Sequence, residues 1–137
     1  MAVAWTEGGK LFCSEPRGDK GTPDIPEPVL VDGRVCPFCR PALGGDEDDT
    51  LYVAYREELD GNVRDIYLRR RPAGETEFRP PVRVSTEGFT SPACPMAGPA
   101  IAAAGEGRIV IAYIVPGDRP ELKAACSTDG GASFGAA

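Results

Sequence analysis

The chain contains an internal repeat, and a repeat of this kind constrains the fold more than any single motif. The stretch CPFCRPAL, which starts at Cys36, is matched by CPMAGPAI, which starts at Cys94. At the same offset TLYVAYRE is matched by RIVIAYIV, which places Tyr113 on Tyr55, and a partial copy near the start places Trp5 on Tyr55. The repeat unit of about 50 to 58 residues indicates an array of similar structural units.

Each repeat has the sequence pattern of short β-strands. In the best-defined unit, Leu51, Val53 and Tyr55 occupy alternate positions, which is the period of two of a strand. Clusters of Gly, Pro, Asp and Asn separate these runs and mark turns. The pattern predicts four strands in a full unit, at residues 38–43, 50–57, 63–70 and 81–84.

Four short antiparallel strands per unit are typical of a β-propeller blade. The sequence therefore predicts an all-β chain that forms a propeller segment of about two and a half four-stranded blades. Its parts are an incomplete blade at 1–31, a complete blade at 36–84 and an incomplete blade at 94–137, which ends after its third strand. Because unpaired strand edges and half-covered cores are unfavourable, we expect further blades or self-association to close the propeller.

The composition agrees with a turn-rich β protein and excludes several functions. There are 17 glycines and 14 prolines, which leave little room for long helices. The net charge of -6 gives no electrostatic basis for binding nucleic acid. No apolar run is long enough to span a membrane, and the N-terminal residues lack a signal-peptide pattern. Histidine is absent, so imidazole bases, nucleophile arrangements that need histidine and histidine-containing zinc sites are excluded.

One turn carries a specific motif. In STDGGASF, Ser127 and Asp129 have side chains suited to bonding turn amides, Gly131 suits a left-handed backbone, and Phe134 is placed to pack between strands. This pattern resembles the Asp-box, Ser/Thr-x-Asp-x-Gly-x-x-aromatic, of the sialidase-like (BNR repeat) β-propellers. The resemblance extends over essentially the whole chain, through CRPALGG, LYVAYRE and CPMAGPAI.

The resemblance implies a six-bladed propeller outside the cytoplasm, periplasmic or secreted, that binds a glycan or a protein or serves as a scaffold. The alternative is an exo-sialidase-type glycoside hydrolase whose remaining active-site blades lie outside this chain or in a second copy. Sialidases of this family use an arginine triad, a Tyr/Glu pair and an Asp acid from blades around the axis, and this chain holds at most half of that set. Asp-boxes lie away from the axial cleft, so the motif itself indicates fold rather than activity.

Of three charged features, only the first is a candidate for binding. Arg40 stands at the predicted start of an inner strand and, with Cys39, is the candidate ligand-binding pair, because the next repeat has no arginine there. The alternative for Arg40 is a surface or ion-pair residue. Arg64 and Asp65 are predicted to be salt-bridged or solvated on opposite faces of a strand. The acidic run at 46–49 lacks the spacing of a calcium loop and is predicted to be a solvated turn.

The five cysteines divide into two sets. Cys13 and Cys126 are predicted to be small buried residues. Cys36 and Cys94 occupy equivalent positions of neighbouring units and Cys39 lies three residues after Cys36, so these three are predicted to cluster. The cluster leaves a disulfide between units, free buried thiols and a metal site as alternatives. Because a closed zinc site needs four ligands, we expect no metal and no cofactor.

Overall fold

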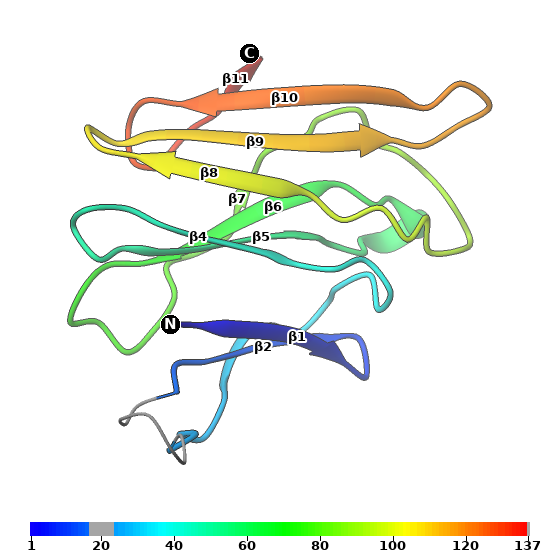
Figure 1. Cartoon of the computed structure of the whole chain (residues 1–137). Helices are drawn as coiled ribbons and strands as arrows, with labels where there is room; N and C mark the ends of the chain where they lie inside the picture. Colours follow the sequence, from blue (N-terminus) through cyan, green and yellow to red (C-terminus); the bar gives the residue numbers. More distant parts are fainter. Residues whose placement is uncertain (17–23, 137) are drawn as a thin grey trace.

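The computed structural model describes residues 1–16 and 24–136 and consists of three antiparallel β-sheets stacked as layers (Figure 1). The predicted all-β class is confirmed; the helical content of the described part is one short 3-10 turn, η1 (Asp60–Asn62). Residues 17–23 of the predicted first unit and Ala137 of the last lie outside the described residues. No helix in the described part is long and apolar enough to cross a membrane.

The middle sheet is a four-stranded meander in which each strand pairs with the next along the chain. Its strands are β4 (Ala42–Gly45), β5 (Leu51–Arg56), β6 (Ile66–Arg71) and β7 (Val82–Arg83). The predicted strand at 38–43 is wrong for its first four residues, because β4 begins at Ala42. Residues 36–39 form a tight turn instead, in which the Cys39 amide donates to the Cys36 carbonyl at 3.3 Å.

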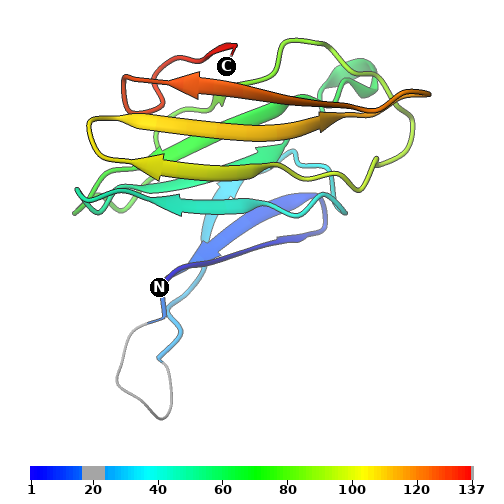
Figure 2. The same cartoon turned by 45° about the horizontal axis from the view of Figure 1, so that its top comes forward.

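The other two sheets flank the middle one (Figures 1 and 2). The first sheet holds β1 (Val3–Glu7), β2 (Lys10–Ser14) and β3 (Val29–Asp32). The third holds β8 (Ala100–Ala104), β9 (Arg108–Val115), β10 (Glu121–Ser127) and β11 (Gly135–Ala136). The expectation that the last unit ends after three strands is wrong, because β11 pairs with β10 as a fourth strand.

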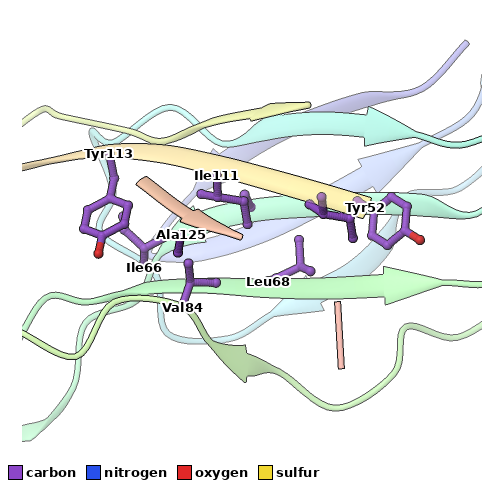
Figure 3. Close-up of a cluster of buried hydrophobic side chains, with 9 residues drawn as sticks. Tyr52, Ile66, Leu68, Val84, Ile111, Tyr113 and Ala125 are labelled. Carbon is purple, nitrogen blue, oxygen red and sulfur yellow. The ribbon is translucent and has the colours of Figure 1, made fainter. Parts of the chain in front are cut away.

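Two apolar cores fill the spaces between the sheets, and β5 contributes to both. Tyr52 and Ala54 belong to the cluster shared with the third sheet, and Figure 3 shows Tyr52 in this cluster with Ile111 and Leu68. Val53 and Tyr55 belong to the other cluster, against the first sheet. Strand β5 is therefore covered on both faces, as the continuous apolar run LYVAY requires.

A hydrogen bond from a tyrosine hydroxyl to a carboxylate joins the first sheet to the middle sheet and the middle sheet to the third. The Tyr55 hydroxyl donates to Asp32 at 2.7 Å, and the Tyr113 hydroxyl donates to Glu87 at 3.2 Å. In each case a tyrosine of a second strand reaches a carboxylate at or just beyond the end of the preceding sheet's last strand. Burial raises the pKa of both phenols, and the adjacent carboxylate raises it further, to about 12 for Tyr113. The repeat in the sequence is thus also a repeat in how the sheets dock.

Candidate functional site

The segments that lead into β4 and β8 bring three cysteines together. These two strands lie side by side, so Cys36 and Cys39 in the first segment meet Cys94 in the second. The Sγ atoms of Cys36 and Cys94 are 2.6 Å apart, and that of Cys39 lies 3.3 Å from Cys36 and 3.4 Å from Cys94. The predicted cluster is therefore present, but the disulfide between units is not formed, and all five cysteines of the chain are free thiols.

The cluster is buried and surrounded by hydrogen-bond donors. Cys36 and Cys39 are almost fully buried, and Cys94 is half-buried. Arg64 Nη1 donates to the Cys36 sulfur at 3.2 Å, and the Met96 amide donates to the Cys94 sulfur at 3.4 Å. Donors directed at sulfur stabilise a thiolate more than a thiol, because the thiolate is the stronger acceptor.

The three thiols differ in acidity. Burial raises the pKa of Cys36 and, more strongly, that of Cys39, because the charged form is costly away from water. Burial also acts on Cys94, but hydrogen bonds from Cys36 and from the Met96 amide outweigh it and lower its pKa. Cys94 is thus the first of the three to ionise, and the cluster can form a disulfide or hold a metal ion.

Arg64 and Asp65 are not the solvated pair that one alternative predicted. Both are buried and lie just before β6. The Arg64 guanidinium binds both carboxylate oxygens of Glu58, at 3.0 and 3.1 Å. Asp65 forms an ion pair with Arg83 and accepts a hydrogen bond from the Ser85 hydroxyl at 3.2 Å. Each is salt-bridged, but to a different partner.

The candidate ligand pair does not share one environment. Cys39 is buried in the thiol cluster, whereas the Arg40 side chain is exposed. The Arg40 backbone contacts the next unit, where Gly98 lies so close that an added Cβ would be 2.0 Å from the Arg40 carbonyl oxygen. Arg40 can therefore meet a ligand from solvent directly, whereas the sulfur of Cys39 is covered and lies behind the half-buried Cys94, 3.4 Å from its sulfur.

The acidic run at 46–49 forms a turn that satisfies its own first carboxylate. Asp46 accepts hydrogen bonds from the amides of Asp48 and Thr50 at 3.1 and 2.9 Å and from the Tyr52 hydroxyl at 2.7 Å. Its oxygens are engaged inside the turn, which favours the predicted turn over a calcium site.

The turn at 127–134 is held by its own side chains. The Ser127 hydroxyl accepts the Gly131 amide at 2.9 Å, and Asp129 accepts the Ser133 amide at 3.0 Å. Gly131 has a φ of 78°, in the left-handed region that favours glycine. Phe134 packs against the core between the middle and third sheets.

Substituting Asp129 with Asn should lower stability at neutral pH and have less effect in acid. Hydrogen bonds from Ser133, Ser127 and turn amides hold the pKa of Asp129 far below its usual value of about 3.9. A depressed pKa adds stability above the unfolded value that is lost as pH falls through the folded value. The difference in urea midpoint between the native chain and Asp129→Asn should therefore be largest at pH 7 and shrink below about pH 4.

The control for this prediction is Asp118→Asn, because Asp118 is exposed and makes no hydrogen bond within the described residues. Equal midpoint differences for Asp129→Asn at pH 7 and pH 3 would contradict the role of the ionised carboxylate.

Two site residues differ from the sequence analysis. Cys13 is buried as predicted, but the predicted burial of Cys126 is wrong: it is half-buried on the outer face of the third sheet, beside Val110. Arg56 was not singled out, yet it is buried and donates to the carbonyls of Ala97 and Ile114. The available signal was a charged residue that ends an otherwise apolar strand.

The thiol cluster and the exposed Arg40 lie toward one end of the sheets, and the turn at 127–134 lies at the other. No protein-family model, curated protein or solved structure matches the chain. The likeness to sialidase-like propellers therefore depends on the motif residues, and the functional argument depends on the geometry described above.

Proposed function

We propose that the chain is a segment of a sialidase-like β-propeller that acts outside the cytoplasm as a binding or scaffold module, completed by further blades or by a second copy. The observation that carries this proposal is the repeated docking of one sheet on the next through a tyrosine–carboxylate hydrogen bond, Tyr55 to Asp32 and Tyr113 to Glu87. A contact that recurs between successive antiparallel sheets is expected of a propeller, whose blades repeat around an axis.

The two outer faces support completion by additional sheets. In the aligned repeat, Val110 takes the position of Tyr52 and Ile114 that of Arg56, and in the middle sheet these positions are buried beneath the third sheet. In the third sheet Val110 and Ile114 are 43% and 40% exposed. An apolar face of this kind marks a contact surface.

The opposite outer face is similar. Trp5, which aligns with Tyr55, stacks on Phe12 with ring centroids 5.9 Å apart, and the adjacent Leu30 is 52% exposed. Tyr55 itself is covered by the first sheet. The chain therefore presents one face suited to a following sheet and another suited to a preceding sheet, which allows head-to-tail closure of a ring.

Substituting Ile114 with Glu should weaken association of the chain with a completing sheet. A buried, unpaired carboxylate is costly, so the substituted face should stay in water. We expect the native chain to sediment above its monomer mass of 14.5 kDa and Ile114→Glu to sediment as the monomer. The matched control is Ile25→Glu, because Ile25 is 66% exposed and lies outside the strands.

A native chain that is a folded monomer and binds no hydrophobic dye would contradict the proposal that these faces need a cover. Folding is monitored by circular dichroism in the same samples.

A binding role is favoured over catalysis because the buried arginines of this chain are already engaged. Arg56 donates to backbone carbonyls, and Arg64 pairs with Glu58. Arg40 remains exposed for an anionic ligand such as a glycan carboxylate. Binding to a glycan array and hydrolysis of a fluorogenic sialoside, each compared between the native chain, Arg40→Ala and Arg119→Ala, separate the binding role from the sialidase alternative.

A further inference from the structure

We propose that Cys36, Cys39 and Cys94 form an all-sulfur, three-coordinate site for a single soft metal ion, with Cu(I) as the preferred ion. The site goes beyond the proposed binding role and does not depend on it. It also departs from the expectation of no metal, which was based on the four ligands of a closed zinc site.

The positions of the sulfurs support the proposal. The three Sγ atoms come from two segments and lie within 3.4 Å of one another. Metal–sulfur bonds of about 2.3 Å place sulfurs roughly 4 Å apart around one ion. The Cys36 and Cys94 sulfurs therefore need to separate by about 1.4 Å and the other two pairs by less than about 1 Å to enclose an ion, which rotations about χ1 can provide.

The local backbone has the form of a metal-binding turn. The Cys39 amide donates to the Cys36 carbonyl, which closes a four-residue turn with both sulfurs on one side. In the second segment, the Met96 amide donates to the sulfur of Cys94 two residues earlier. Hydrogen bonds that orient the ligands and offset their charge are characteristic of metal centres.

Arg64 donates a hydrogen bond into the cluster from a fixed position. Its side chain is 4% exposed, and Nη1 contacts the Cys36 sulfur at 3.2 Å while the same group is held by Glu58 and the Ser91 carbonyl. A disulfide would join only two of the three sulfurs and leave this positive group beside a weak acceptor. The arrangement of donors is better explained by ligands that become thiolates when a metal ion binds.

The ligand set selects the ion. Cys36, Cys39 and Cys94 form a complete group by themselves, since no carboxylate of the described residues joins it. Three soft ligands without a hard one favour Cu(I) over Mg²⁺, Ca²⁺ or Mn²⁺. Binding replaces three S–H bonds with three metal–sulfur bonds and releases three protons to the buffer, with no change in oxidation state.

The test is an anaerobic titration of the fully reduced chain with Cu(I) in competition with a chromophoric chelator. We expect one Cu(I) per chain, and we expect Cys39→Ser and Cys94→Ser to weaken binding at least about tenfold, by analogy with the loss of ligand-supporting groups. Cys126→Ser is the matched control, because Cys126 lies on the outer face of the third sheet, and it should bind as the native chain does.

Thiol alkylation of the native chain keeps the test independent of how the variants fold. Bound Cu(I) should protect Cys94, the half-buried member of the cluster, and leave the labelling of Cys126 unchanged. The proposal is overturned if the reduced chain binds no Cu(I), if Cys39→Ser binds it as tightly as the native chain, or if Zn²⁺ binds more tightly than Cu(I). A Cys36–Cys94 disulfide in the isolated protein, with no Cu(I) bound after reduction, would also overturn it.

Discussion

Gly98→Ala should be among the most destabilising substitutions in the chain, although it adds a single methyl group. A Cβ at Gly98 would lie 2.0 Å from the carbonyl oxygen of Arg40 and 3.0 Å from its carbonyl carbon. The obstacle is backbone, so no side-chain rotation relieves it. The segments leading into β4 and β8 would have to separate, and we expect a loss of about 3 kcal/mol in the free energy of unfolding.

Gly33→Ala is the matched control, because a Cβ there meets no atom within 4 Å. Urea denaturation of both variants measures the difference. A loss below about 1 kcal/mol in Gly98→Ala would show that the two segments separate easily. The same variant should also expose the buried Cys36 to alkylation, because its burial depends on the close approach of these two segments.

The strands were the most predictable part of the fold, because local periodicity determines them. The predicted run at 50–57 contains β5, and the run at 81–84 contains β7. The run at 38–43 failed because its first two residues belong to the turn that brings Cys39 to Cys36. That turn is stabilised by contacts with the segment around Cys94, which a local pattern does not contain.

Contacts between sheets were less predictable, because the partners do not keep one spacing. Tyr55 and Tyr113 align in the repeat, but Tyr55 lies 23 residues from its partner Asp32 and Tyr113 lies 26 residues from Glu87. Their partners also differ in type, so self-comparison of the sequence finds the tyrosines and not the carboxylates. The thiol cluster was predictable because Cys36 and Cys94 keep both the spacing and the residue type.

Arg56→Met should lower stability strongly, because Arg56 joins two sheets from a buried position. The side chain is 2% exposed and donates to the carbonyls of Ala97, Arg64 and Ile114 at 3.1, 2.7 and 2.8 Å. Methionine keeps the length and the apolar stem but leaves three carbonyls without this donor. Each lost bond to a charged group is worth about 1.5 to 3 kcal/mol, partly offset because a buried charge is also removed, so we expect a net loss of about 3 kcal/mol.

Urea denaturation and amide hydrogen exchange of Arg56→Met measure this loss, with Arg119→Met as control because Arg119 is exposed and makes no hydrogen bond within the described residues. Exchange should accelerate most in β9, where Ile114 loses its partner. A stability equal to that of the control would mean that the desolvation of the guanidinium cancels its three hydrogen bonds. In that case the hydrogen bond from Arg56 to the Ile114 carbonyl would fix the alignment of the middle and third sheets without adding to the free energy of unfolding.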